Sequence, residues 1–528
     1  MKSKLSKVLS IFQSHNSLMT ILFLGCLSVY FIFICYLNLS LNTGFYCTDM
    51  YSDILYSVKA WEAKSLFPEG WVFGNQFYII ATPALASLVY GIVGNPALSM
   101  AIATILMTLG IFLSYSWMTR PVFKKSHERL LGLVCLVTLV AFCGDAIYKL
   151  NGWQLFFTLC SYYACYLITA FLCFGCFLRR NEKLTVFRII ILVIALLMSF
   201  ATGMQSLRQT AVMLVPMVAV ECFEQAVYFY RNRKIQWQGV IITGSFLVAN
   251  FMGIVAIKLL NIPHNEIIST TTLLSKNEIP KAVNDSISHL VKLLTKSENY
   301  GIVLLISVII TVISAFQIKY RKTAPSKGWG TLISLFAFSI AGVFVIDMFT
   351  KLSVRNIYYF MLYVLISLLV VYAYHHWRLG KIVTVLLVAV LMVSSLNNAV
   401  LPAVNEARDR YSNLSYEISD LLIEKGYTTI YSGWNQCEDV AIASDGAITA
   451  GFWNHPDNDV FQPVTYLCDS SIYNIDSSEC VYYLYSGNKD IALQKAAEAG
   501  ATMTLIAEYP DDGIWLYESS KNLMVINN

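Results

Sequence analysis

The chain has 528 residues, of which 57% are hydrophobic and 13% are charged, and its formal net charge is +4. So small a net charge gives no indication of a nucleic-acid partner. The apolar residues cluster in runs of roughly 17–25, which is the length of a bilayer-spanning helix, and only helices satisfy the backbone of such continuous runs inside a bilayer. The composition therefore predicts an α-helical polytopic membrane protein.

The first predicted span covers residues 17–38. It is expected to stay as a membrane anchor, because its apolar stretch is longer than that of a signal peptide and no cleavage site of small residues follows it. The polar run 48–53 comes shortly afterwards and contains Asp49 and Asp53. Charged groups near hydrocarbon are costly, so two acids at this position favour a functional role. The alternative is a solvated loop that is acidic by chance.

Residues 77–93 are apolar enough to cross a bilayer. Counting them as a span, however, would invert every later loop and place the basic clusters outside. We therefore predict a re-entrant or surface-lying helix that ends at Gly94-Asn95-Pro96. The first outer loop then runs from residue 39 to residue 96.

Ten further spans are predicted at residues 97–118, 130–147, 155–178, 187–205, 210–230, 240–260, 301–318, 330–348, 356–374 and 382–400. Compact clusters of Lys and Arg lie between alternate spans and fall on the same side as the N-terminal lysines. The positive-inside rule makes that side cytoplasmic. The sequence thus predicts about eleven spans in a cell-membrane protein, with a cytoplasmic N-terminus and an extracytoplasmic C-terminal domain.

From residue 405 onward the sequence is mixed and polar, with no run long enough to span. Helical spacing at 405–425 and 490–499 alternates with strand-like runs at 427–431, 502–506 and 513–517. This alternation predicts a small α/β domain. We expect a membrane domain over residues 1–404 and a soluble domain over 405–528, which either recognises an acceptor or only caps the membrane part. A disulfide among Cys437, Cys468 and Cys480 is a further prediction for this outward-facing segment.

Ionisable residues from distant loops collect at the outer ends of the spans in this topology. They are Asp49 and Asp53 after the first span, Asp145 and Lys149 after the third, Arg208 between the fifth and sixth, and Asp347, Lys351 and Arg355 between the ninth and tenth. Each has a structural alternative, since cations at helix ends snorkel to headgroups and acids cap helices or pair locally. Acids and bases gathered on one face nevertheless define a candidate site.

Such a combination suits glycosyl transfer from a lipid phosphate. A carboxylate acts as general base toward an acceptor hydroxyl, whose oxygen attacks the anomeric carbon through an oxocarbenium-like state. Arginines stabilise the leaving phosphate by paired, charge-assisted hydrogen bonds. No residue spacing requires a metal, so no cofactor is predicted, although a divalent cation is compatible with the site.

These features resemble the GT-C superfamily of polytopic glycosyltransferases, especially the bacterial relatives of the protein mannosyltransferases and aminoarabinose transferases. The likeness rests on the acidic motif 49–56 with Trp61 and the run 68–71, on the half-hydrophobic segment from Thr82 to Gly94, on Arg355 with the aromatic residues that follow it, and on a soluble outer domain after the last span.

The resemblance implies a polyprenyl-phosphate sugar as donor and a cell-surface polymer, glycolipid or protein as acceptor. It implies that Asp53 is the base, with Asp49 as second choice, and that Asp145 positions the acceptor or a metal. The implied substrate-binding residues are Arg355, Arg208, Lys351, Tyr56 and Trp61. The chain departs from the family because Ile54, rather than Glu, follows Asp53. The choice between Asp49 and Asp53 therefore stays open.

Two other functions remain as alternatives. A membrane transporter or flippase of lipid-linked sugars would use charges within its spans, and Glu221 and Glu224 in the sixth span favour it. A polysaccharide polymerase or ligase would also act at the outer face, but on a diphosphate-linked oligosaccharide.

Overall fold

The computed structural model describes residues 16–74, 77–141, 152–158, 163–205, 207–264, 273–295, 327–350, 359–376, 378–411, 413–454 and 458–526. Contacts between residues divide the chain into two compact units. Unit 1 comprises Met1–Ile34, Leu106–Leu260 and Ile268–Pro402, and unit 2 comprises Cys35–Ile105, Asn261–Ile267 and Ala403–Asn528. These units group residues by contact, so the division into domains at residues 404 and 405 stays a prediction.

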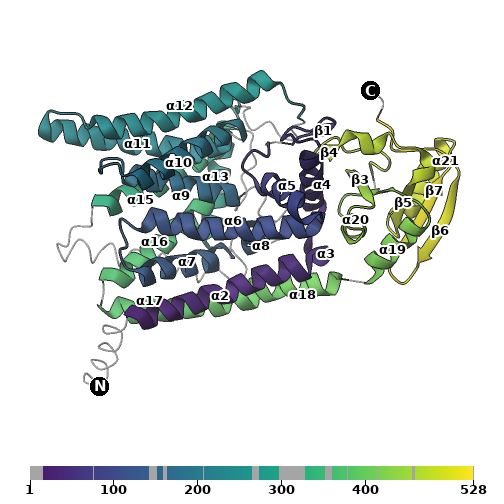
Figure 1. The fold of residues 1–528 in the computed structure, drawn as a ribbon, viewed down its shortest axis with the longest axis horizontal. Helices are drawn as coiled ribbons and strands as arrows, with labels where there is room; N and C mark the ends of the chain where they lie inside the picture. The colour runs from purple at the N-terminus through teal and green to yellow at the C-terminus, as the bar shows by residue number, and fades with distance from the viewer. Residues whose placement is uncertain are drawn as a thin grey trace. The chain divides into compact units, whose positions relative to one another are not determined.

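Unit 1 is built from long apolar helices. Its described elements are parts of α2 (Asn16–Ser40) and α6 (Pro96–Thr119), then α7 (Ser126–Val140), α8 (Gly152–Phe157), α9 (Ala164–Leu178), α10 (Val186–Gln205), α11 (Leu207–Asn232), α12 (Trp237–Leu260), α13 (Ile279–Thr295), α15 (Lys327–Phe349), α16 (Phe360–His376), α17 (Arg378–Ser395) and the π-helix η2 (Leu396–Val400) (Figure 1). The helices pack in pairs, α10 with α12, α11 with α15 and α7 with α16.

Seven helices in the described part of the chain are long and apolar enough to cross a membrane. They are the helices over residues 17–40, 96–119, 186–205, 209–232, 237–260, 328–349 and 381–410, and they coincide with seven of the predicted spans. Shorter helices, α7, α9 and α16, cover parts of three more, and the predicted span 301–318 lies outside the described residues. The predicted fold class, a multi-pass α-helical membrane protein with a small α/β region at its C-terminal end, is confirmed.

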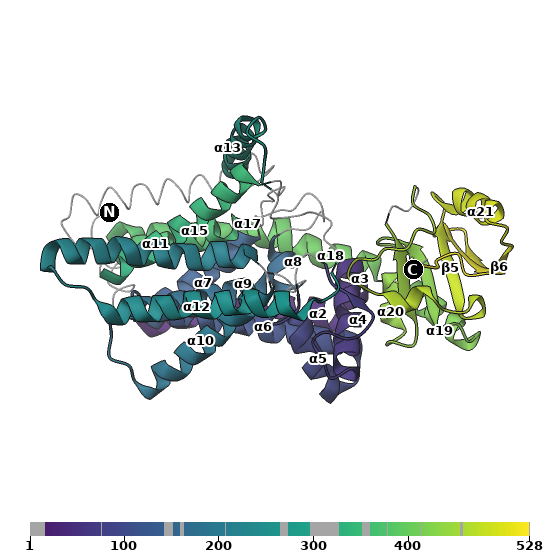
Figure 2. The same ribbon diagram turned by 90° about the horizontal axis from the view of Figure 1, so that it is seen from above.

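Small residues bring α10 and α12 together, and Figure 2 shows these helices side by side. A Cβ atom on Gly203 would lie only 2.0 Å from the carbonyl oxygen of Asn250, so no larger residue fits there. The side-chain amide of Asn250 donates to the carbonyl oxygen of Ser199 at 2.9 Å, and the Ser199 hydroxyl donates to the carbonyl oxygen of Phe246 at 3.1 Å. Close backbone approach with polar side chains between helices is typical of membrane helix pairs.

A buried ion network joins the end of α9 to α11 and α15. Arg180 lies just beyond α9 with its side chain 4% exposed, and its guanidinium contacts Glu221 at 2.5 Å and Glu224 at 2.7 Å. The amide of Gln225 donates to Glu221 at 2.6 Å, and the Thr331 hydroxyl donates to Glu224 at 2.5 Å. Both acids of the sixth predicted span are therefore held by a cation and by neutral donors.

Unit 2 combines the first loop with the C-terminal segment. Its elements are α3 (Asn42–Phe45), α4 (Thr48–Glu62), β1 (Trp71–Val72), α5 (Thr82–Val93), most of α18 (Leu401–Arg410), α19 (Asn413–Glu424), β2 (Thr429–Gly433), α20 (Glu438–Ala443), β3 (Thr449–Trp453), β4 (Cys468–Asp469), the 3-10 helices η3 (Ser470–Tyr473) and η4 (Ser477–Glu479), β5 (Cys480–Tyr485), α21 (Lys489–Glu498), β6 (Met503–Tyr509) and β7 (Ile514–Ser519).

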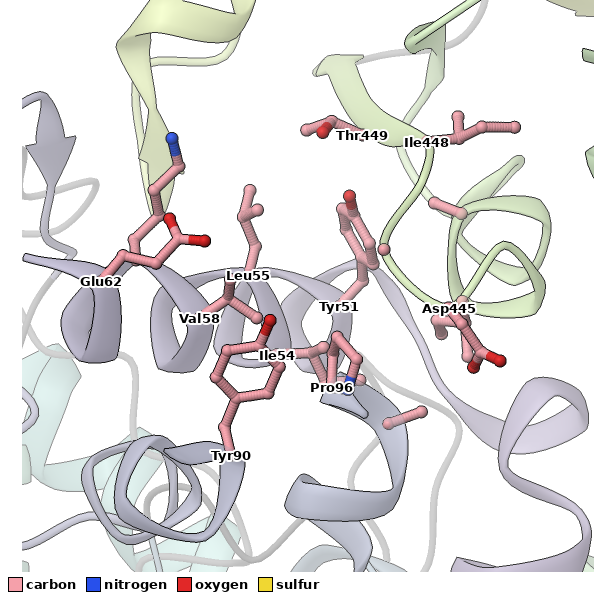
Figure 3. A pocket seen from close by; sticks show the side chains of 15 residues that line it. Tyr51, Ile54, Leu55, Val58, Glu62, Tyr90, Pro96, Asp445, Ile448 and Thr449 are labelled. Atoms are coloured by element: carbon pink, nitrogen blue, oxygen red, sulfur yellow. The ribbon is translucent and has the colours of Figure 1, made fainter. Parts of the chain in front are cut away.

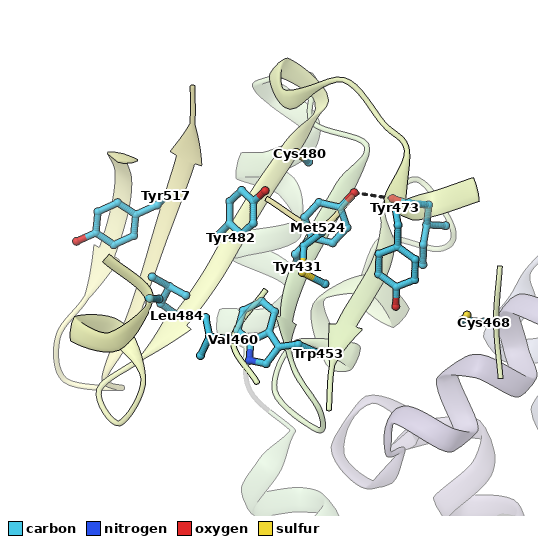
Figure 4. Packing of buried hydrophobic residues seen from close by; sticks show 12 residues of the cluster. Tyr431, Trp453, Val460, Cys468, Tyr473, Cys480, Tyr482, Leu484, Tyr517 and Met524 are labelled. Carbon is cyan, nitrogen blue, oxygen red and sulfur yellow. Dashed lines mark hydrogen bonds between the residues drawn. The ribbon is translucent and has the colours of Figure 1, made fainter. Parts of the chain in front are cut away.

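A five-stranded sheet with the order β3-β2-β5-β7-β6 forms the centre of the C-terminal segment. Strand β2 runs parallel to β3 and β5, whereas β7 runs antiparallel to β5 and β6. Large aromatic side chains fill its core, among them Tyr431, Trp453 and Tyr482 (Figure 4). The three predicted strands correspond to β2, β6 and β7, while β3 and β5 were not predicted. The predicted disulfide is wrong, because Cys437, Cys468 and Cys480 are all free.

The first loop pairs with the C-terminal segment through strands and hydrogen bonds. Strand β1 is antiparallel to β4, and the Ser470 amide donates to the carbonyl oxygen of Gly70 at 2.9 Å. The predicted apolar segment after it forms α5, which ends at Gly94 with a positive φ of 74°. A helix of 12 residues is only about 18 Å long, too short to cross a bilayer.

Candidate active site

The two acids of the first loop lie on one face of α4. Asp49 lies in the first turn of the helix, where the helix dipole stabilises a negative charge. Asp53 follows one turn later on the same face and is only 1% exposed. The run that looked like a polar loop in the sequence is thus helical. Its two carboxylates are one helical turn apart and lie on the same face.

A third carboxyl, that of Glu438 at the start of α20, lies near these acids. Burial raises the pKa of the Cys47 thiol, and the charges of Asp49, Glu438 and Asp53 raise this pKa further. All three carboxyls therefore lie close enough to the Cys47 thiol to interact with it electrostatically. Segments almost 400 residues apart in the sequence supply one acidic group.

Glu438 has a pKa far from that of an exposed glutamate. Burial raises the pKa of its carboxyl to about 8, and the charge of Asp439 adds to the effect. A hydrogen bond with the Thr48 side chain acts in the opposite direction. Near neutral pH this carboxyl is therefore largely protonated. Titratable groups with such shifts are concentrated at functional sites.

Sequence reasoning missed Glu438. The adjacent acids Glu438 and Asp439 are visible in the C-terminal segment, but nothing in the sequence connects them with α4. The connection depends on a reciprocal pair of hydrogen bonds: the Thr48 amide donates to the Asn435 side chain at 3.0 Å, and the Asn435 amide donates to the Thr48 hydroxyl at 2.8 Å.

Two further contacts fix the orientation of α4. The Ala450 amide of β3 donates to the Tyr51 hydroxyl at 2.8 Å. At the other end of the helix, Lys59 forms an ion pair with the buried Asp469 at 2.8 Å. Contacts near the start of α4 and in its last turn leave little freedom for the helix to rotate, so the acidic face keeps a fixed direction within unit 2.

The predicted substrate-binding residue Tyr56 lies in an aromatic cluster of the first loop. Its ring contacts Trp71, Phe73 and Tyr78, with centroids 5.4, 5.7 and 4.8 Å away. Its hydroxyl donates to the carbonyl oxygen of Leu66 at 2.9 Å. This packing supports the helix that carries the acids, and a direct contact with substrate stays a prediction.

Trp61 lies at the last turn of α4 and is half-buried. The Lys64 ammonium lies 3.5 Å from the centre of its ring. A Cβ atom on Gly91 would lie 2.2 Å from the Trp61 ring, so this ring packs directly against the backbone of α5. Trp61 therefore holds α4 and α5 together, and its contact with substrate also stays a prediction.

The remaining predicted site residues are not brought together by the described structure. Asp145, Lys149, Lys351 and Arg355 lie outside the described residues. Arg208 lies in the first turn of α11, in unit 1. Within the part of the chain that the structure describes, no three His, Cys, Asp or Glu side chains are grouped so as to hold a metal ion.

Taken together, the apolar helices, the acidic helix of the first loop and the C-terminal α/β region form a fold similar to that of a solved membrane protein, ArnT. The chain is similar to ArnT from Cupriavidus metallidurans bound to undecaprenyl phosphate, with a TM-score of 0.51, 12% identity, and coverage of 96% of this chain and 99% of that one. The apo structure of the same protein gives a TM-score of 0.52 with the same identity and coverage.

The archaeal oligosaccharyltransferase from Archaeoglobus fulgidus, in complex with zinc and sulfate, gives a TM-score of 0.41 at 12% identity and covers 93% of this chain and 73% of that one. No family model matches the sequence, and no curated protein matches it. At 12% identity the likeness to ArnT establishes the fold alone.

Proposed function

We propose that the protein is a membrane glycosyltransferase that moves a sugar from a polyprenyl-phosphate donor to an acceptor at the outer face of the membrane. The observation that carries this proposal is the buried Asp53 on the acidic face of α4. Support comes from the fold, since the similar protein ArnT has been solved with undecaprenyl phosphate bound. The same lipid phosphate would carry the sugar here.

Asp53 acts as the general base in the proposed reaction. Its carboxylate removes the proton of the acceptor hydroxyl, and the acceptor oxygen attacks the anomeric carbon of the donor sugar. The bond from that carbon to the phosphate oxygen breaks through an oxocarbenium-like state, and the polyprenyl phosphate leaves with the bonding electrons. A single displacement of this kind inverts the anomeric configuration.

The positive charges of the outer loops neutralise the leaving phosphate. Arg355 and Arg208 bind its oxygens by paired hydrogen bonds, and Lys351 adds a point charge. Asp145 positions the acceptor or a divalent cation. Asp49 lies next to Asp53 on the same face, and it remains the second choice for the base.

Glu438 gives the acidic group a protonated member. At neutral pH its carboxyl is largely protonated, since burial raises its pKa to about 8, and a neutral carboxyl does not repel Asp53 as a charged one would. Glu438 is a positioning residue in this account, because no substrate contact is assigned to it.

The transporter alternative loses its main support. Glu221 and Glu224 contact Arg180 at 2.5 and 2.7 Å in a network with further donors. Acids that couple transport must release a proton or an ion during each cycle, whereas these two are held by a buried cation. Their position in the sixth span is thus explained by packing between helices.

Reconstitution in lipid vesicles distinguishes the two functions. Purified protein would be incubated with a polyprenyl phosphate carrying a labelled sugar and with candidate acceptors. The proposed enzyme releases free polyprenyl phosphate and forms a labelled glycoside with inverted configuration. Movement of intact labelled donor to the other leaflet, with no free lipid phosphate released, would support a flippase instead.

A further inference from the structure

Unit 2 contains a cavity of about 270 Å³ beside α4 (Figure 3). One face of α4 forms its floor, and Tyr90 of α5, the start of α6 and the segment from α20 to β3 form its walls. In Figure 3, Glu62 and Tyr90 lie on one side of the cavity, and Ile448 and Thr449 lie on the other. Every one of these residues belongs to unit 2.

The cavity lies on the side of α4 opposite to the acids. Tyr51, Leu55, Val58 and Glu62 follow one another at intervals of four, three and four residues, and all line the cavity. Asp53 lies about 200° around the helix from Tyr51, because each residue turns an α-helix by about 100°. The helix, with a diameter of about 10 Å, thus separates the cavity from the proposed base. The cavity is not the place where the bond forms.

The polar groups of the cavity match those that recognise sugars. The Tyr51 hydroxyl accepts a hydrogen bond from the Ala450 amide at 2.8 Å, so its own proton is available to a ligand. Among the described residues, the Glu62 carboxylate and the Tyr90 hydroxyl have no hydrogen-bond partner and no ion pair. A carboxylate accepts hydrogen bonds from neighbouring hydroxyls, and tyrosine rings pack against the CH face of a sugar ring.

Charge at the cavity selects among sugars. Lys59 is the cation at its wall, and this ammonium already pairs with Asp469 at 2.8 Å. Glu62 and Asp445 therefore leave a net negative rim, which disfavours a uronic acid or a phosphorylated sugar. Its volume equals that of about nine water molecules, which suits a single sugar ring of about a dozen heavy atoms.

We infer that this cavity binds one neutral or amino sugar unit of the acceptor, away from the hydroxyl that reacts. The inference rests on the proposed function, because it makes the acceptor a glycan that contacts both sides of α4. It also limits the acceptor class, since a protein without glycans or a purely anionic polymer would not fill this site. The cavity residues then act in acceptor selection, whereas Asp53 acts in bond formation.

Binding of simple glycosides to the full-length protein in detergent tests the inference. The probes are the methyl glycosides of glucose, galactose and N-acetylglucosamine, with methyl glucuronide as the anionic comparison, titrated by saturation-transfer NMR. Val58→Phe fills the cavity and Tyr90→Ala removes an aromatic wall. Asp420→Asn changes an exposed acid of α19 and is the control. Melting temperatures verify that each variant is folded.

At least one neutral glycoside should bind saturably to the wild type, and about tenfold more weakly to each cavity variant, a loss of roughly 1.4 kcal/mol. The glucuronide should bind more weakly than its neutral counterpart, and Asp420→Asn should change nothing. The inference is overturned if no neutral glycoside saturates, or if a folded Val58→Phe or Tyr90→Ala protein binds as the wild type does.

The inference and the proposed function fail separately. Asp53→Asn should bind the glycoside as the wild type does, because Asp53 lies on the other side of the helix. If this variant loses transfer while the cavity variants bind normally, only the inference fails. If the cavity variants lose binding while Asp53→Asn still transfers sugar, the assignment of the base fails and the binding site stands.

Discussion

Two groups of buried acids, one in each unit, are stabilised in opposite ways. In unit 1, Glu221 and Glu224 share the guanidinium of Arg180, and hydroxyl and amide donors occupy other oxygens. In unit 2, burial and the charge of Asp439 raise the pKa of Glu438 to about 8, and within the described residues no Lys or Arg forms an ion pair with it. The acids of the first group are held by a shared cation and neutral donors, whereas burial favours the protonated form of Glu438 in the second group.

The difference separates acids that support the fold from acids that can take part in chemistry. An ion pair fixed between helices gains nothing from changing its protonation state, and its removal costs stability. A carboxyl that titrates near neutral pH can exchange its proton under working conditions. The acidic group around α4 therefore remains the better candidate for a functional site.

The largest effect on stability is expected from Arg180→Met. This change leaves the buried Glu221 and the half-buried Glu224 without their cation, and removing one partner of a buried ion pair typically costs about 3–5 kcal/mol. Thermal unfolding in detergent should show a strongly lowered melting temperature, and a triple variant that also carries Glu221→Gln and Glu224→Gln should recover most of it. An unchanged melting temperature for Arg180→Met alone would contradict the structural role of the network.

A pH-dependent effect is expected from Glu438→Gln. A carboxyl whose folded pKa is raised from 4.5 to about 8 binds more protons in the folded than in the unfolded state between those values, so it lowers stability as the pH rises through that window. The glutamine variant should therefore gain stability relative to the wild type between pH 5 and 8, by roughly 1–3 kcal/mol. The measurement is the melting temperature of both proteins across this range.

Glu424→Gln, at an exposed position in α19, is the control for that comparison. Its stability difference from the wild type should not depend on pH in the same window. If Glu438→Gln behaves like this control, Glu438 is ionised at neutral pH and the contrast between the two acid groups disappears.

A smaller effect is expected from Thr48→Val, which keeps the shape of the side chain but removes its hydroxyl. The Asn435 amide loses its acceptor and Glu438 loses a hydrogen bond, so we expect a loss of about 1–2 kcal/mol. Because the two residues interact, the effects of Thr48→Val and Glu438→Gln should not add in the double variant. Strict additivity in thermal unfolding would show that the Thr48 hydroxyl does not act on Glu438.

The sequence predicts features that depend on neighbouring residues. Continuous apolar runs predicted the spans that the structure contains, and the Gly94-Asn95-Pro96 turn predicted the end of α5. The polar run 48–53 marked Asp49 and Asp53 as candidate site residues, but the helix α4, which gives them a shared face, was not predicted.

Features that depend on distant residues were not predicted. Thr48 and Asn435 are 387 residues apart, so their hydrogen bonds and the approach of Glu438 to α4 could not be read from local patterns. The pairing of Arg180 with Glu221 also required the packing of α9 against α11, which periodicity does not define. As a result, Glu221 and Glu224 looked like transport residues in the sequence, although the structure holds them in an ion pair.

Transfer by Asp53→Asn, compared with Asp420→Asn, tests the central claim most directly. Both changes replace a carboxylate by an amide of the same shape, one on the acidic face of α4 and one on the exposed surface of α19. With a polyprenyl-phosphate sugar and an acceptor in vesicles, Asp53→Asn should lose about 100-fold or more of the transfer rate while staying folded. Asp420→Asn should match the wild type. Full activity in a folded Asp53→Asn protein would contradict the assignment of Asp53 as the base.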